Sequence, residues 1–174
     1  MPAKSVKIVQ ISDMHLNPAN EPEPAHFLAI RDRVNDIGPA HVVITGDISG
    51  DGFEPQNEGM FDALAKIFQT FNAPVHVVPG NHDVGNQPSA MVTTTEALLN
   101  HWLKTFPDRF SVTCETWQLV GLNSQIIGNT MPHAVEQVSW LAKEIEKAKA
   151  NHKHVAVYQH LPYYFYDERE QFGW

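Results

Sequence analysis

The sequence has a single cysteine, few basic residues and no long apolar run. Cys114 has no partner for an internal disulfide, and it cannot form a cysteine-based metal site by itself. No stretch approaches the ~20 apolar residues that a helix needs to cross a bilayer. The segment from Met1 to Lys7 also lacks the apolar stretch of a secretory signal. We therefore expect a protein of a reducing, cytoplasmic setting, with no membrane as partner.

Basic residues are outnumbered along the whole chain. Twelve Lys and Arg face twenty Asp and Glu, which gives a formal net charge of −8. A protein that binds a polyanion usually carries a basic patch, because neutralised phosphates release counterions. The basic residues here are scattered, so nucleic acid is an unlikely partner. Histidine is abundant instead, since ten occur among 174 residues and several stand beside Asp, Asn or Gly.

The hydrophobic pattern alternates short strand-like runs with longer helical ones, which predicts one α/β domain over residues 1–174. The predicted strands are Val6–Ser12, His41–Thr45, Val75–Val78, Phe110–Cys114, Trp117–Asn123 and His154–Gln159. The predicted helices have apolar residues three and four positions apart, and they are Ala25–Ile37, Met60–Phe71, Thr95–Phe106 and Val135–Ala150. In the last helix, Val138, Leu141 and Ile145 share one apolar face.

Residues able to bind a metal follow directly after several predicted strands. They are Asp13 and His15 after the first strand, Asp47 after the second, Asn81, His82 and Asp83 after the third, and His160 after the last. In open α/β sheets, ligands bind beyond the carboxyl ends of the strands. Residues two apart lie on the same side of an extended chain, so Asp13 and His15 can bind one cation. Imidazole nitrogens with carboxylate and amide oxygens suit Mn, Fe, Zn or Co.

Each of these motifs has a simpler explanation when taken alone. Asp-x-His can be a solvated turn, and Gly-Asp after a strand is common as a helix-capping turn. Gly-Asn-His-Asp can be a turn that uses the backbone tolerance of Gly and Asn, and His160 can be a core histidine. All four motifs in order, each at a strand end, favour a metal site. The remaining histidines flank strands or helices, except His133, which lies in a predicted loop that could approach the site. We leave all of them outside the predicted site.

Taken in order, these motifs resemble those of the calcineurin-like metallophosphoesterases. The resemblance covers nearly the whole chain, and it implies a sandwich of two β-sheets flanked by helices. It also implies two divalent transition metal ions, one held by Asp13, His15 and Asp47 and the other by Asp47, Asn81 and His160. By the same motifs, the side chains at positions 82 and 83 would be catalytic. His82 would contact the phosphate and donate a proton to the leaving oxygen, while Asp83 would orient and charge that histidine.

The reaction implied by this resemblance is hydrolysis of a phosphate ester by a hydroxide that bridges the two metal ions. The expected partner is a small phosphorylated substrate, preferably a phosphodiester such as a cyclic nucleotide. The alternatives are a phosphomonoesterase acting on proteins or small molecules, and a binding scaffold of the same fold without catalysis. The family's later Gly-His-x-His motif does not follow His160. We therefore expect this chain to be the N-terminal part of the domain, truncated relative to the family pattern, and a homo-oligomer stays open.

Overall fold

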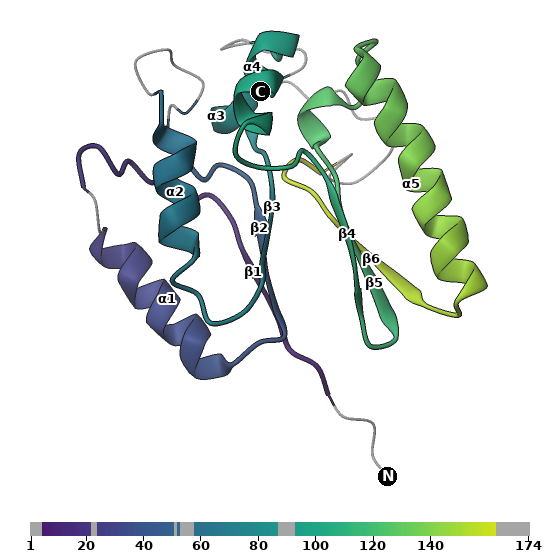
Figure 1. Ribbon diagram of the computed structural model, residues 1–174, viewed down its shortest axis with the longest axis horizontal. Coiled ribbons are helices and arrows are strands. Elements are labelled where there is room, and N and C mark those ends of the chain that lie inside the picture. Colours follow the sequence, from purple (N-terminus) through teal and green to yellow (C-terminus); the bar gives the residue numbers. More distant parts are fainter. Residues whose placement is uncertain (1–4, 22–23, 51, 53–57, 87–92, 163–174) are drawn as a thin grey trace.

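The computed structural model describes residues 5–21, 24–50, 52, 58–86 and 93–162. In this part of the chain, two three-stranded β-sheets lie face to face, and helices cover their outer surfaces (Figure 1). Helices α1 (Ala25–Ile37) and α2 (Met60–Phe68) lie outside the first sheet, and α5 (Pro132–Ala150) lies outside the second. The predicted α/β sandwich of two sheets flanked by helices is therefore confirmed.

The first sheet is parallel throughout. Its strands, in spatial order, are β1 (Ile8–Ile11), β2 (His41–Thr45) and β3 (Val75–Val78). The central strand contains Val42, Val43 and Ile44, all fully buried. Such an unbroken apolar run is typical of a parallel strand that is covered on both faces. Because the strands are parallel, their carboxyl ends meet at one edge of the sheet.

The second sheet is mixed. Strand β4 (Phe110–Cys114) pairs antiparallel with β5 (Trp117–Gly121), and β5 pairs parallel with β6 (His154–Tyr158). The carboxyl end of β6 points to the same edge of the sandwich as those of the first sheet. His160, two residues after β6, reaches the backbone carbonyl of Thr45 at the end of β2. Both sheets therefore contribute to one edge.

The predicted elements agree with the structure to within a few residues. Strands β1, β5 and β6 are shorter than predicted, α2 ends at Phe68, and α5 begins three residues earlier, at Pro132. The helix predicted over Thr95–Phe106 is α4 (Glu96–Leu103). The sequence pattern did not predict helix α3 (Asn81–Val84) or the 3-10 turn at Ser124–Ile126. Both are too short to produce a hydrophobic period.

The apolar face predicted for α5 is not its buried face. Val138 is 68% exposed and Ile145 is 41% exposed, whereas Ala134, Gln137 and Ala148 are buried. Two small alanines allow the helix to approach the sheet closely. The Gln137 side chain also accepts a hydrogen bond from the backbone N–H of residue 123 and donates one to its carbonyl. This pair of bonds fixes the rotation of the helix, which the hydrophobic pattern alone could not indicate.

Most of the apolar core lies between the first sheet and helices α1, α2 and α4. It contains a cluster of aromatic side chains, including Phe27, Phe61, Phe68 and Trp102. The rings of Phe61 and Trp102 meet edge to face with their centroids 5.0 Å apart. Packing of this kind keeps the first sheet and its carboxyl-end edge rigid. Within the described ranges, none of the helices has the length and apolar character required to cross a membrane.

Candidate metal centre

The predicted metal ligands come together at the carboxyl-end edge of the first sheet. They are Asp13 and His15 after β1, Asp47 after β2, Asn81 at the start of α3, and His160 after β6. The last of these comes from the other sheet. Its Nδ1 atom lies 2.9 Å from the carbonyl oxygen of Thr45 and its Nε2 atom lies 3.0 Å from Asn81 Oδ1. The two sheets thus meet at the site.

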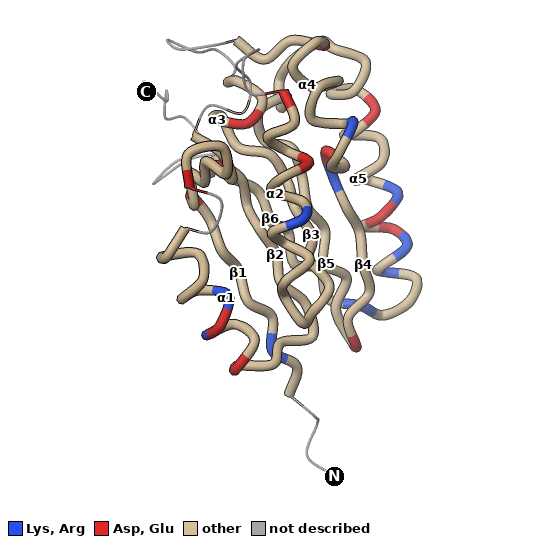
Figure 2. The backbone as a smooth tube through the Cα atoms, turned by 60° about the vertical axis from the view of Figure 1, so that its left-hand side comes forward, with Lys and Arg blue, Asp and Glu red and all other residues tan. Residues whose placement is uncertain are grey.

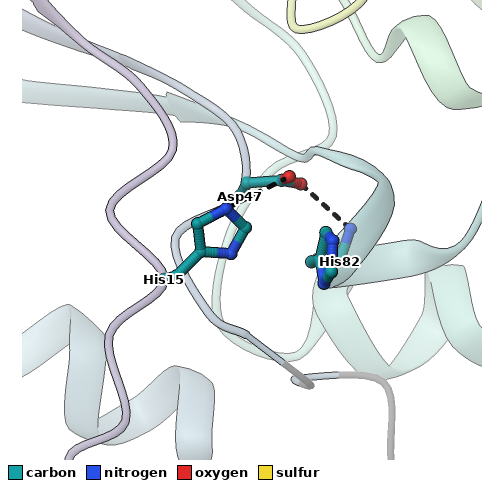
Figure 3. Close-up of side chains that lie close together, drawn as sticks. All are labelled: His15, Asp47 and His82. Atoms are coloured by element: carbon teal, nitrogen blue, oxygen red, sulfur yellow. Dashed lines mark hydrogen bonds and ion pairs between the residues drawn. The ribbon is translucent and has the colours of Figure 1, made fainter.

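Asp47 lies at the centre of this group and is nearly buried, with 5% of its side chain exposed. Its Oδ2 atom lies 3.8 Å from His15 Nε2, and its Oδ1 atom lies 3.5 Å from His160 Nε2. The backbone N–H of His82 donates a hydrogen bond of 2.9 Å to Oδ1. Figure 3 shows the carboxylate with the His15 and His82 side chains on either side of it. Each carboxylate oxygen therefore faces a different histidine.

Two groups of potential ligands in the described part of the chain share Asp47. One group is His15, Asp47 and His82, and the other is Asp13, Asp47 and His160, with ligand atoms within 4.8 Å of one another in each. A carboxylate that belongs to two groups can bridge two cations through its two oxygens. The grouping differs from the one implied by the family motifs. Asp13 lies with His160 instead of His15, and His82 joins His15.

The surroundings of His160 suit a bound cation. Nδ1 donates its hydrogen to the Thr45 carbonyl, because a carbonyl oxygen can only accept. In a neutral imidazole the other nitrogen, Nε2, then carries a lone pair. That lone pair faces Asn81 Oδ1 at 3.0 Å and Asp47 Oδ1 at 3.5 Å. A cation between three electron-pair donors that converge in this way would stabilise them, and nitrogen and oxygen donors of this kind fit a divalent transition metal.

The ring of His82, in the first turn of α3, lies beside Asp47 and His15. Its Nδ1 atom lies 2.6 Å from the carbonyl oxygen of Gly50, so Nδ1 carries a hydrogen and Nε2 is left for a ligand. The ring meets that of His15 edge to face, with centroids 4.8 Å apart. The described geometry therefore allows His82 to contact either a cation or an anion held beside Asp47.

The chain after β1 is not extended, which corrects the expectation for Asp13 and His15. Both have left-handed backbone conformations, with φ of 57° and 45°, and Asp47 has a φ of 50°. Such conformations cost of order 1–3 kcal/mol each in non-glycine residues and gather at functional sites. Backbone hydrogen bonds from Asp13 N–H to the Gly46 carbonyl and from His15 N–H to the Asp47 carbonyl hold the segment in place. The two side chains still reach the site, but from a coiled segment.

Two glycines allow the loops after β2 and β3 to touch. A Cβ at Gly46 would lie 2.6 Å from the backbone nitrogen of Gly80, and a Cβ at Gly80 would lie 2.3 Å from the backbone nitrogen of Asp47. Real Cβ atoms do not approach other atoms so closely. The glycines of the Gly-Asp and Gly-Asn-His-Asp motifs are therefore required by the contact between the loops, which brings Asp47 beside Asn81.

Asp83 does not contact the ring of His82, which corrects the role expected for it. Its carboxylate is fully buried and accepts hydrogen bonds from Gly80 N–H at 2.8 Å, Ser49 N–H at 3.1 Å and Ser49 Oγ at 2.9 Å. The ring is oriented by the Gly50 carbonyl instead. The pKa of Asp83 is raised to about 6 overall: burial raises it most, the hydrogen bonds from Gly80 and Ser49 lower it in part, and the nearby Asp47 adds to the rise.

Sequence reasoning did not identify several groups that support the ligands. Ser12 Oγ is hydrogen-bonded to Asp13 Oδ2 and lies 3.2 Å from the Thr45 carbonyl. The other supports are Ser49 and the backbone carbonyls of Thr45 and Gly50. A serine beside the first motif was a visible signal. A carbonyl contact leaves no trace in the sequence, because every residue has a carbonyl.

Most of the histidines left outside the predicted site have partners elsewhere. His41 Nδ1 lies 3.0 Å from His76 Nε2 at the amino-terminal ends of β2 and β3, away from the metal ligands. His133 Nδ1 lies 3.5 Å from a carboxylate oxygen of Glu96. His154 packs against the ring of Trp117. These contacts are consistent with structural roles.

The model of the calcineurin-like phosphoesterase family matches residues 6–174. The chain belongs to this family. The resemblance drawn from the motifs is thereby confirmed, and family membership implies divalent metal ions at the site.

Relatives of the chain include two kinds of phosphoesterase. It is 27% identical over 168 residues to the 3',5'-cyclic adenosine monophosphate phosphodiesterase CpdA of Escherichia coli (strain K12), covering 89% of this chain and 55% of that protein. It is 33% identical over 133 residues to the serine/threonine-protein phosphatase CPPED1 of Homo sapiens, covering 71% of this chain and 40% of that one. The chain spans about half the length of the curated relatives it matches.

A solved structure supports the fold. A dimetal phosphatase from Danio rerio aligns with 90% of this chain and 70% of its own, with a TM-score of 0.57 and 14% sequence identity. At this identity the similarity concerns the fold alone. It agrees with the two facing sheets and outer helices described above.

Proposed function

We propose that the protein is a metal-dependent phosphoesterase that hydrolyses small phosphodiesters, with cyclic nucleotides as the preferred substrate class. The observation that carries this proposal is the Asp47 carboxylate, which is nearly buried and belongs to both groups of potential ligands. A buried carboxylate surrounded by imidazole nitrogens is costly without a cation to balance it. Two cations that share it would remove that cost.

The proposed ligands of two ions are Asp13, His15, Asp47, Asn81 and His160, with Asp47 as the bridge. Divalent ions held there would lower the pKa of a bound water and neutralise charge on the phosphoryl oxygens. Mn, Fe, Zn and Co all accept these donors. Two carboxylates balance only half of the four positive charges, so the site would attract an anionic phosphate despite the net charge of −8.

His82 is the proposed proton donor. Its Nδ1 hydrogen bond to Gly50 fixes the ring and directs Nε2 toward the site. In the imidazolium form, Nε2–H can donate to the ester oxygen as the bond between phosphorus and that oxygen breaks. The leaving group departs as an alcohol, and His82 regains its proton from solvent. Asp83 takes no part in this transfer in our proposal, since it does not touch the ring.

A small substrate is favoured over a nucleic acid by the charge distribution. Lys and Arg are interleaved with Asp and Glu, most visibly on α5, and no broad basic tract follows the described part of the backbone (Figure 2). The name of the Escherichia coli relative favours a cyclic diester. The name of the Homo sapiens relative favours a phosphomonoester instead, which makes a phosphatase the second candidate. The single cysteine favours a cytoplasmic setting.

The test is a rate comparison on two esters. The purified protein is stripped of metal, reloaded with Mn²⁺, and assayed on cyclic AMP and on p-nitrophenyl phosphate, with Asp47→Asn as the inactive control. We expect a higher kcat/KM on the diester. A higher value on the monoester would favour the phosphatase. Stoichiometric metal binding with hydrolysis of neither ester would overturn the proposed function and leave a binding scaffold.

A further inference from the structure

The carboxylate of Asp83 joins the two loops that carry the central ligands. Asp83 follows β3, yet three of its hydrogen-bond donors belong to the loop after β2. Oδ1 accepts from the backbone N–H and the hydroxyl of Ser49 at 3.1 and 2.9 Å, and Oδ2 lies 3.3 Å from Ile48 N. Oδ2 also accepts from Gly80 N–H at 2.8 Å within its own loop. Hydrogen bonds to an ionised carboxylate are stronger than those between neutral groups.

The carboxylate of Asp47 links the same two loops in the opposite direction. This residue belongs to the loop after β2, and its Oδ1 accepts a hydrogen bond of 2.9 Å from the backbone N–H of His82 in the loop after β3. Each loop therefore uses a carboxylate to hold backbone amides of the other. Neither loop can move without breaking bonds at both carboxylates, so the position of Asp47 depends on that of Asp83.

Asp83 is also connected to the ring of His82, through hydrogen bonds of the neighbouring residues Ser49 and Gly50. Asp83 holds Ser49, and the next residue, Gly50, supplies the carbonyl that accepts from His82 Nδ1 at 2.6 Å. Gly52 N–H also donates to Ser49 Oγ at 2.9 Å, which fixes this hydroxyl further. The orientation of the ring is therefore set by a peptide group that Asp83 anchors.

We propose that Asp83 is a positioning residue, a buried clasp that holds the Ile48–Gly50 segment against Gly80 and thereby orients both Asp47 and the His82 ring. The consequences for metal binding and turnover rest on the proposed function. The positioning itself is a property of the metal-free protein, so it can be measured separately. Asp83 influences His82 through the Ser49–Gly50 peptide instead of by direct contact.

The test compares Asp83→Asn with Asp108→Asn. Asp108 is also a buried carboxylate, 6% exposed, but it lies beside Arg109, away from the metal ligands. Nitrogen-15 NMR of the imidazole rings in metal-free protein reports which nitrogen of His82 carries the hydrogen. We expect the Nδ1–H form in the wild type and in Asp108→Asn. In Asp83→Asn we expect a mixture of both forms, because the amide NH₂ repels the backbone donors and frees Gly50.

Mn²⁺ titration and kinetics give the second readout. Loss of a residue that orients metal ligands typically lowers metal affinity ~10–100-fold, and we expect a loss in this range for Asp83→Asn and none for Asp108→Asn. At saturating Mn²⁺, kcat should fall while KM stays nearly constant. A folded Asp83→Asn protein with unchanged His82 signals and unchanged Mn²⁺ affinity would overturn the proposal.

Ser49→Ala keeps the test decisive if Asp83→Asn does not fold. This variant removes one hydrogen bond to the carboxylate and leaves Asp83 in place. It should shift the His82 ring signals in the same direction by a smaller amount, and unchanged signals would overturn the clasp. If the wild type binds Mn²⁺ but hydrolyses neither ester, the proposed function fails, whereas the NMR and affinity measurements still decide the role of Asp83.

Discussion

The two sheets of this sandwich are built differently and contribute unequally to the candidate site. The first sheet is parallel, its central strand is fully buried, and the loops at its carboxyl ends carry all the proposed ligands except His160. The second sheet is mixed, and apolar side chains of this sheet and of its covering helix are exposed, including Val157 of β6 at 49% and Val138 of α5 at 68%. A rigid, well-packed sheet thus supplies most of the site, and the less enclosed sheet supplies one histidine.

The prediction with the largest expected effect compares a ligand from the first sheet with the one ligand from the second sheet. Asp47→Asn should bring bound metal toward zero and lower kcat/KM by more than the ~10²–10⁴-fold contributed by a general acid alone, because both ions depend on this carboxylate. His160→Asn, from the second sheet, should lose one ion and less activity. Elemental analysis and initial rates measure both. Retention of two ions per chain in Asp47→Asn would show that Asp47 does not bridge.

The second prediction separates phosphate contact from metal binding within the first sheet. His82→Ala should lower kcat by ~10²–10⁴-fold while most of the metal stays bound, since its proposed role is proton donation. Elemental analysis of the purified variant gives the metal content. Because His82 lies with His15 and Asp47 in one group of potential ligands, a parallel loss of metal and activity would reassign it as a ligand.

The third prediction compares a buried position of the first sheet with an exposed position of the second. Ile44→Ala in β2 should lower the free energy of unfolding by ~2–5 kcal/mol, because the side chain is fully buried. Val157→Ala in β6 should change it by less than ~0.5 kcal/mol, as is usual for exposed positions. Urea unfolding followed by circular dichroism measures both. A similar cost at the two positions would mean that Val157 is covered in solution.

The smallest effect concerns the contact between the sheets. His76 of β3 packs on Phe110 of β4, and burial together with the neighbouring His41 lowers its pKa below the ordinary 6.5. The unfolded chain therefore binds a proton more readily than the folded protein does. The contribution of His76 to the free energy of unfolding should be constant above about pH 6.5 and fall as the pH drops toward its folded pKa.

His76→Gln should remove this slope, whereas His154→Gln, at an exposed position of β6, should keep it. Urea unfolding of the metal-free protein at several pH values provides the measurement. A slope that survives in His76→Gln would assign the proton to another group.

The sequence was sufficient to predict the fold because strand and helix signals agree with the packing. The run His41–Thr45 became β2 and Ala25–Ile37 became α1, with unchanged bounds. The rotation of α5 was not predictable, because it depends on the hydrogen bonds between Gln137 and the backbone of a distant residue, Asn123. The hydrophobic periodicity alone favoured Val138 as a core residue, whereas tertiary packing leaves its side chain exposed.

For the site, strand ends predicted which residues converge but not how they are grouped. Asp13 falls in one group with His160, and left-handed conformations at Asp13 and His15 replace the extended chain on which the predicted pairing of Asp13 with His15 depended. The position of Asp83 was also beyond the sequence, since the resemblance to the family motif suggested a contact with His82 that the structure does not show. Local spacing identifies candidate ligands, whereas the direction of a side chain after a tight turn requires coordinates.

The contact of His160 with the Thr45 carbonyl joins positions 115 residues apart in the chain. A cation shared by Asp47 and His160 would reinforce this contact as a reversible cross-link between the sheets. A ligand at a hundredfold excess over its Kd stabilises the folded state by about 2.7 kcal/mol. The supply of metal would then set how long the protein survives a protease, and a chelator would shorten that lifetime in the absence of any substrate.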